Sequence, residues 1–491
     1  MKTPELDRGL GLTGLVATGV CAMIGGAINI IPFAIQRSVP GIGPNVFPAY
    51  LLAGVPAVLA GIAFAILASA MPRAGGTYVY ASRALNPYLG FVASFSQWMA
   101  ISVAMGVVSY LLVPFLRDVA VAAGADGLAA FLERGPVRLT LSLGFLWTAV
   151  AVNIRGIGTY QRTVVPLMFL TLILCGLVIV AGFWYDQTDF VAALTARDGS
   201  TVPDIAATPL TAAILLPAAT ILFSSFIGFD SIAQAGGEAR NPGRNLPLAI
   251  LIAVGGVAIF YFLFTTALYH AVPWQFVADQ ATRRDLTAPG LLGYLLPRPL
   301  TVLIVAGAAV ALIKDLPAML LGVSRLMFAW GEDGIFPAAV ARVHPIRRTP
   351  HVAILASGAM ASLSVLGCYV ARDFFLGVDI LVTAMLVNFF LMCLSVIFLP
   401  IRNPAIAAGI TVIPNRAAQL PIAVLGAVVM AAFFAIHTWK DLHAPIPWFL
   451  RSTWDWLIVL AIGSLIYFRE TRALARRGID LAARCRELPP Q

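Results

Sequence analysis

Two glycines, Gly25 and Gly26, and a lysine–aspartate pair, Lys314 and Asp315, are the residues of this chain best suited to binding charge. Both pairs interrupt stretches that are otherwise apolar enough to cross a membrane. Glycine lowers the free-energy cost of leaving a helix. A broken helix exposes N–H groups that attract anions and carbonyl groups that attract cations. The pattern predicts non-covalent recognition of a small molecule that carries both charges.

No catalytic residue, metal ion or cofactor is predicted. The five histidines lie at the ends of apolar spans or in loops, without the spacing of metal ligands. The five cysteines are scattered and show neither a metal nor a redox motif. An enzyme would need a nucleophile beside a base, or a metal cluster, so we expect a protein that is not an enzyme.

The composition indicates a membrane protein made of helices. Hydrophobic residues make up 60% of the 491 residues and charged residues only 11%, whereas charged residues make up about 25% of soluble domains. Apolar runs about 20 residues long predict transmembrane helices. We expect twelve spans, at roughly 12–36, 44–71, 86–116, 138–155, 161–184, 209–236, 246–272, 300–330, 350–371, 375–400, 419–439 and 454–468.

The distribution of charge predicts the orientation of these spans. Most of the 32 lysines and arginines fall in segments that share one side with both termini. The positive-inside rule then places both termini in the cytoplasm and the protein in the cell membrane. The net charge of +9 is explained by this orientation, so the lipid bilayer is an expected partner and nucleic acid is not.

The first of these spans, 12–36, is expected to break at Gly25 and Gly26 and to resume as a helix at Ala27. The sixth span repeats the anomaly with Ser224, Ser225 and Gly228, followed by an ionisable Asp230. Serine, glycine and aspartate all compete with helical structure. Because five spans separate the breaks, the two broken helices run in opposite directions. This arrangement is typical of an inverted repeat with a binding site at mid-membrane.

Four motifs in order along the chain strengthen this interpretation. They are IGGAINIIP from residue 24, PRAGGTYVYASRALNPYLGF from residue 72, GFDSIAQAGGEARNPGRNLPLAI from residue 228 and GVSRLMFAWGEDGIFP from residue 322. Together they resemble the motifs of the amino acid–polyamine–organocation family of permeases. The resemblance implies ten helices in two inverted five-helix repeats, plus two more. It also implies secondary active transport of amino acids or related amines by alternating access.

The domain organisation follows from the spans and the resemblance. We expect a cytoplasmic N-terminus at 1–11, a first repeat at 12–184, an extracellular loop at 185–208, a second repeat at 209–400, two further spans at 401–468, and a cytoplasmic tail at 469–491. The tail is rich in arginine and is expected to be an amphipathic, lipid-facing or frayed helix.

The resemblance also implies the substrate site. The substrate carboxylate is expected on the N–H groups of the first break, and its amino group on carbonyls of both breaks. The expected residues are Gly25, Gly26 and Ala27 for the carboxylate, then Cys21, Ala22, Ser224, Ser225, Ile227 and Gly228, with Phe226 and Phe229 as candidate gates. Asn29 stands where relatives have a bulky apolar residue. It hydrogen-bonds either a substrate side chain or a neighbouring helix, and we favour the helix.

Lys314 and Asp315 fall where sodium-coupled relatives place hydroxyl groups around a bound sodium ion. A charge at the bilayer centre costs about 3 kcal/mol or more and needs a partner. We expect the Lys314 ammonium to occupy this cation position, held by carbonyls of the first span and by Asp315 or Asp230. Neighbouring helical residues point about 100° apart, so Lys314 and Asp315 are not expected to be each other's best partners. A fixed ion pair between two spans is the alternative.

Asp230 is expected to cap the second half of its broken span, or to accept protons. Glu238 and Arg240 are expected to form an inner gate as an ion pair, or else a solvated face. The predicted function is sodium-independent transport of a zwitterionic amino acid with a small or medium apolar side chain, coupled to protons or driven by exchange. A transporter of polyamines, other organic amines or purines, or a sensor of the same fold that does not transport, are the alternatives.

Overall fold

The computed structural model describes residues 6–283, 286–371 and 375–489, and there it forms helices without any β-strand. Ten helical segments of this part are long and apolar enough to cross a membrane. They are α1 (Leu12–Met23) joined to α2 (Gly26–Ser38), α3 (Val46–Ala70), α5 (Pro87–Ala122), α7 (Gly135–Ile154), α8 (Ile157–Trp184), α12 (Pro242–Ala271), α15 (Arg298–Asp333), α16 (His351–Ala371), α17 (Phe375–Arg402) and α19 (Arg416–His443). The all-α polytopic membrane fold is confirmed, whereas the count of twelve spans stays a prediction.

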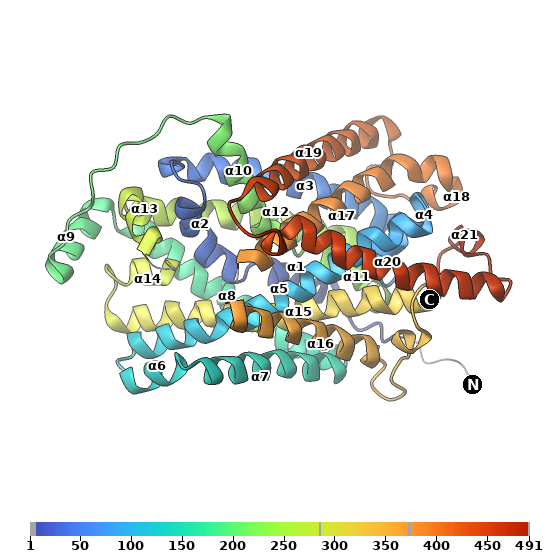
Figure 1. The fold of residues 1–491 in the computed structure, drawn as a ribbon, viewed down its shortest axis with the longest axis horizontal. Coiled ribbons are helices and arrows are strands. Elements are labelled where there is room, and N and C mark those ends of the chain that lie inside the picture. The colour runs from blue at the N-terminus through green and yellow to red at the C-terminus, as the bar shows by residue number, and fades with distance from the viewer. Residues whose placement is uncertain (1–5, 284–285, 372–374, 490–491) are drawn as a thin grey trace.

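The long helices run side by side, and several short helices lie at the two ends of the bundle (Figure 1). At one end lie α9 (Gln187–Asp198), α13 (Trp274–Arg283) and α14 (Ala288–Leu292), and at the other α4 (Gly76–Ala84), α18 (Pro404–Ala407) and α21 (Leu481–Arg484). Large aliphatic side chains such as Ile173, Ile259 and Leu363 are exposed on the outer helices. A soluble protein seldom exposes such an apolar surface, and lipid is its natural surrounding.

The first span is interrupted at Ile24 and Gly25. Helix α1 ends at Met23 and α2 begins at Gly26, one residue before the predicted start at Ala27. Neither residue between them has helical backbone angles; Gly25 has φ −127° and ψ −141°. The interruption lies inside the bundle, where α1 packs against α12, α15 and α8. Irregular backbone at such a depth is tolerated when it is buried in protein or lines a cavity.

The second interruption follows α10 (Ala212–Leu222). A 3₁₀ turn at Phe223–Phe226 leads to an extended residue, Ile227, and helix α11 then covers Asp230–Gln234. Gly228 has φ +137°, a value that glycine adopts easily and other residues rarely do. A Cβ atom at this position would overlap the backbone carbonyl of Ala22. The two interruptions are therefore in direct contact at this point.

The segment 185–208 contains more structure than the predicted loop. Helix α9 occupies half of it and begins with a capping box, in which the Asp186 side chain accepts from the backbone N–H of Asp189, and the Asp189 side chain accepts from the N–H of Asp186. These backbone hydrogen bonds lower the pKa of Asp186 below its usual value. Asp186 and Asp189 thus serve the start of this helix.

The end of the chain folds back onto the bundle, which differs from the frayed or lipid-facing helix we expected. Helix α20 (Ser452–Arg476) is followed by α21, and the tail beyond it contacts α4 and Asn403, the N-cap residue of α18. Arg73 and Arg83 donate from Nε to the carbonyls of Pro489 and Glu487, at 3.0 and 3.2 Å. Arg83 also pairs with Asp333 at the end of α15, at 2.6 Å. The tail thus contacts α4, the N-cap of α18 and, through Arg484 and the Glu332 carbonyl, α15.

Candidate functional site

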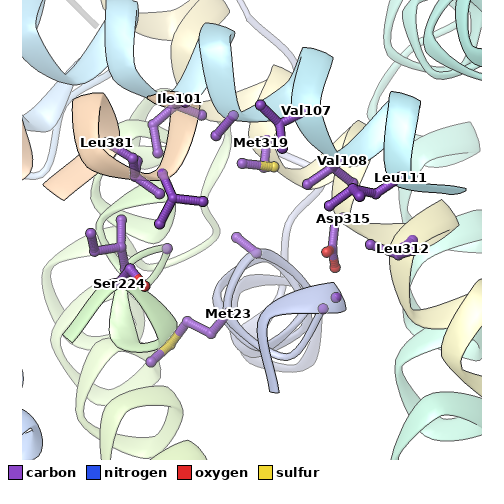
Figure 2. A pocket seen from close by; sticks show the side chains of 18 of the residues that line it. Met23, Ile101, Val107, Val108, Leu111, Ser224, Leu312, Asp315, Met319 and Leu381 are labelled. Atoms are coloured by element: carbon purple, nitrogen blue, oxygen red, sulfur yellow. The ribbon is translucent and has the colours of Figure 1, made fainter. Parts of the chain in front are cut away.

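A cavity of about 100 Å³ lies where the two interruptions meet α5, α15 and α17. Figure 2 shows its side chains pointing inward from these elements. The lining comprises Ala22, Met23, Gly25, Gly26, Ile30 and Ile31 of the first broken span, Ser224, Ile227 and Gly228 of the second, Ile101, Ala104, Val107, Val108 and Leu111 of α5, Leu312, Asp315 and Met319 of α15, and Gly377, Val378 and Leu381 of α17. Asp315 is the one charged residue among these, and most of the others are aliphatic.

The Lys314 ammonium lies at the end of α1. Its Nζ donates to the carbonyl of Cys21 at 3.2 Å, to the carbonyl of Ile24, and to Asp315 Oδ1 at 3.0 Å. The lysine is fully buried. An ammonium group has three N–H donors, and these three acceptors use all of them. The charge is thus held by backbone oxygens that the break in the first span leaves without helical partners.

Lys314 and Asp315 bond each other, so Asp315 rather than Asp230 is the acid that helps to hold the ammonium, although neighbours on a helix were not expected to be each other's best partners. Their N···O distance is 3.0 Å, and both side chains are buried. On a helix, the Cβ directions of neighbouring residues differ by about 100°. The flexible four-carbon stem of lysine can nevertheless bend back along the helix surface. Burial away from water then favours the nearest opposite charge.

Several predicted residues point away from the cavity. Cys21 contacts the carbonyl of Val164 on α8, with a sulfur–oxygen distance of 3.7 Å. Asn29 donates to the carbonyl of Gly25 at 3.4 Å, within its own half-helix rather than to a neighbouring helix. Ser225 bonds the hydroxyl of Tyr50 on α3 at 3.2 Å. None of these three side chains is among those that line the cavity.

The two candidate gate residues also lie outside the cavity lining. Phe229 is fully buried and packs against Phe64 and Phe389. Phe226 packs edge to face against Tyr50 and Tyr261. Phe229 thus belongs to the core that fixes the second interruption, and the structure places Phe226 in an aromatic cluster beside α3 and α12.

Asp230 takes part in a hydrogen-bond network separate from Lys314. Its carboxylate accepts from the Gly228 N–H at 3.1 Å and from the side chain of Gln97 on α5. Gln234 bonds Gln97 at 3.2 Å and Thr77 on α4 at 2.8 Å. The expected cap on the following half-helix is wrong, because the carboxylate bonds backwards to Gly228 and Phe229 is the N-cap of α11. The network ties the second interruption to α5 and α4.

Glu238 pairs with Arg325 of α15, so the ion pair between Glu238 and Arg240 that was expected from the sequence is wrong. The guanidinium binds both carboxylate oxygens, at 2.5 and 2.9 Å, and each side chain is only 1% exposed. Arg240 instead donates to the backbone carbonyl of Arg8 at 3.3 Å in an exposed position. A two-point arginine–carboxylate pair is among the strongest polar contacts in proteins. Its partners are 87 residues apart, so sequence spacing alone offered no signal for it.

Three features of the site escaped the sequence analysis. The aliphatic walls supplied by α5 and α17, such as Val107 and Leu381, have no distinctive sequence pattern. Gln97 is an amide side chain in the middle of a largely apolar span, and this was a usable signal, since buried polar groups in membranes need partners. Gly377 lets Val107 of α5 approach the α17 backbone closely, because a Cβ atom at this position would overlap the valine side chain.

Comparison with known proteins identifies the group to which this fold and cavity belong. The family described as amino acid permease matches residues 10–465, which is nearly the whole chain. The chain belongs to the amino acid permease family. Its membrane helices and its cavity at two broken helices are therefore those of a permease, and the family consists of transporters rather than enzymes.

Relatives of this permease differ in what their names say they transport. The methylthioribose transporter of Bacillus subtilis is 26% identical over 96% of this chain and 95% of its own length. The branched-chain amino acid permease BcaP of the same bacterium is 25% identical over 84% of this chain and 86% of its own length. The vacuolar cationic amino acid transporter 4 of Arabidopsis thaliana is 25% identical over 73% of this chain, and the match spans 58% of the plant protein.

Proposed function

We propose that this permease is a sodium-independent secondary transporter that moves a zwitterionic amino acid with an aliphatic side chain across the cell membrane. Alternating access between inverted repeats 12–184 and 209–400, with both termini in the cytoplasm, is part of this proposal. The observation that carries it is the small, aliphatic cavity at the contact between two broken helices. Such sites are typical of transporters that release a substrate to alternate sides of the membrane.

The aliphatic walls favour the side-chain class. Ile101, Val107 and Leu381 face the cavity, together with Met23 and Met319. A cationic side chain would need a carboxylate there, and the one that lines the cavity, Asp315, already pairs with Lys314. A polyamine is disfavoured for the same reason. The branched-chain permease among the relatives agrees with an aliphatic amino acid.

Lys314 is the basis for sodium independence. Its ammonium takes the carbonyl oxygens of Cys21 and Ile24 that would otherwise be free to coordinate a cation. A sodium ion at this position would meet a resident positive charge and would lose these ligands. Coupling to protons and exchange of substrates are both compatible with this arrangement.

A neutral thioether such as methylthioribose is the second candidate substrate. The relative that bears this name matches nearly the whole chain. Met23 and Met319 line the cavity, and a polarisable methionine suits a methylthio group. A purine is less favoured, because none of the aromatic rings of the described chain lines this cavity for stacking.

Uptake into liposomes that contain the purified permease tests these proposals. We expect radiolabelled valine, leucine or isoleucine to enter without sodium, and to enter more slowly when unlabelled leucine competes. Uptake of methylthioribose but of no amino acid would select the second candidate. If the permease binds an amino acid but transports none, whether a proton or sodium gradient is imposed or the liposomes are preloaded with substrate, the protein is a sensor. An absolute sodium requirement would contradict the role of Lys314.

The Lys314→Ala variant should lose uptake by about 10-fold or more in sodium-free medium, because Asp315 is left buried without its cation. Sodium is expected to restore part of this uptake, since two carbonyls and a carboxylate are oxygen ligands that suit a small hard cation. Initial uptake rates with and without sodium chloride, at constant ionic strength, measure the effect. Lys440→Ala, at an exposed site in α19, is the control and should behave as the unaltered protein does. Unchanged uptake by Lys314→Ala would remove the proposed role.

A further inference from the structure

The anion site at the first interruption is already occupied by a carboxylate of the chain itself. Asp315 extends from α15 toward the start of α2 (Figure 2). A Cβ atom on Gly25 would overlap its carboxylate, and the Gly26 backbone donates to it. The Gly25 N–H is also engaged, because it donates to the carbonyl of Met23 at 3.0 Å. Two of the three N–H groups expected to hold a substrate carboxylate thus have partners within the chain.

Lys314 offers no free donor either. Its three N–H groups bind the carbonyls of Cys21 and Ile24 and the Asp315 carboxylate. Of these acceptors, Asp315 is the one on a side chain and so the one that can move without disturbing the backbone of α1. A substrate carboxylate can therefore reach Lys314 and Gly26 only if Asp315 leaves them. Two carboxylates confined to one buried site do not both remain ionised.

We propose that Asp315 is the proton-coupling residue of this permease, an inference that rests on the proposed amino acid substrate. An incoming substrate carboxylate displaces the Asp315 carboxylate from Lys314 and Gly26, and Asp315 takes one proton from water as it is displaced. The substrate carboxylate stays ionised and pairs with Lys314. Release of the substrate on the other side returns Asp315 to Lys314 and frees the proton there.

The charges balance in this exchange. Before binding, Lys314 and Asp315 cancel each other. After binding, the substrate carboxylate cancels Lys314, Asp315 is neutral, and the substrate ammonium adds one positive charge. One proton and one positive charge therefore cross the membrane with each zwitterion. Transport is accordingly driven by a proton gradient and by the membrane potential, and plain exchange is not its main mode.

The other ionisable groups near Asp315 do not compete for this role. Cys21 on α1 and Tyr261 on α12 act as neutral donors to backbone carbonyls, and Cys175 on α8 is a buried thiol. On the side of α5 the neighbours are aliphatic. Asp230 is engaged by Gln97 and Gly228, and it does not line the cavity. Asp315 is thus the titratable carboxylate that a bound substrate would meet in the described part of the chain.

Calorimetric titration of the purified permease in two buffers of different ionisation enthalpy counts the protons taken up on binding. The ligands are valine, leucine, isoleucine and methionine, each added alone. We expect about one proton per bound amino acid for the unaltered protein. Asp315→Asn keeps the shape and the acceptor oxygen but cannot titrate, so it should bind the amino acid with no proton taken up. Asp230→Asn is the comparison variant, and its binding should still take up the proton.

The outcomes separate this inference from the proposed function. Binding of an amino acid without proton uptake by the unaltered protein would overturn the coupling role and leave the transport proposal intact. Proton uptake that persists in Asp315→Asn, or that disappears in Asp230→Asn instead, would also overturn it. Absence of binding and of uptake for all four amino acids would remove the proposed function, and the coupling role with it. If Asp315→Asn does not fold, the number of protons that the unaltered protein takes up per bound amino acid still tests the proposal. A number near zero rejects it.

Discussion

Gly228→Ala is expected to lower amino acid uptake by about 100-fold or more. The Cβ atom of alanine would overlap the carbonyl of Ala22, where the two interrupted helices touch. The backbone at Gly228 also has φ +137°, which a residue with a Cβ adopts only under strain. Overlap and strain together cost about 3 kcal/mol, and each 1.4 kcal/mol is about a tenfold effect. Separation of the interruptions would deform the cavity between them.

Initial uptake rates per molecule of reconstituted protein measure this effect, with gel filtration as the check on folding. The matched control is Gly256→Ala, because a Cβ atom there meets no other atom within 4 Å, on the exposed side of α12. Alanine favours helix over glycine, so the control should keep full uptake. Equal uptake by the two variants would show that the contact between the interruptions is not required.

Removal of one partner of the Glu238–Arg325 pair should destabilise the permease strongly. Both side chains are only 1% exposed and are joined by two hydrogen bonds. A buried charge left without its partner typically costs about 3–5 kcal/mol. Glu238→Ala and Arg325→Ala are each expected to show a clearly lower Tm in detergent and a lower yield of monodisperse protein.

Replacement of both partners should restore most of this loss. In Glu238→Leu/Arg325→Leu no charge remains buried, and an apolar pair of similar volume is often as stable as the ion pair it replaces. A double variant no more stable than the single ones would show that packing at these positions matters more than charge. Uptake by a stable double variant then tests whether the pair also acts as an inner gate.

The two interruptions could be predicted because they rest on local chemistry. Gly25-Gly26 and the Ser-Ser-x-x-Gly run that ends at Gly228 disfavour helix wherever they stand, and the structure breaks both helices within a residue or two of the predicted points. The position of Lys314 at the end of α1 agrees with what the family resemblance implied. Local propensity and the family resemblance sufficed for these features.

Features that depend on which residues meet across the bundle were beyond the sequence. The pairing of Glu238 with Arg325 instead of Arg240 depends on how α15 packs against the second interruption. The bond between Asp230 and Gln97 depends on the position of α5. The bond between Lys314 and Asp315 depends on the burial of both side chains against the end of α1. Each of these outcomes is fixed by tertiary packing, and no sequence period encodes it.

Residues 486–489 are held through their backbone, next to the side-chain contacts that Arg484 and Cys485 make with Glu332 and Asp333. Arg73, Arg83 and Asn403 bind the carbonyl oxygens of Pro489, Glu487 and Arg486. Every amino acid carries such a carbonyl, so these three hydrogen bonds do not depend on which side chain each position carries. A scan of single substitutions there would register little, whereas shortening the segment would remove three anchors at once. The attachment of this segment thus depends on its length and on the course of its backbone. A comparison of residue identities alone does not detect either property.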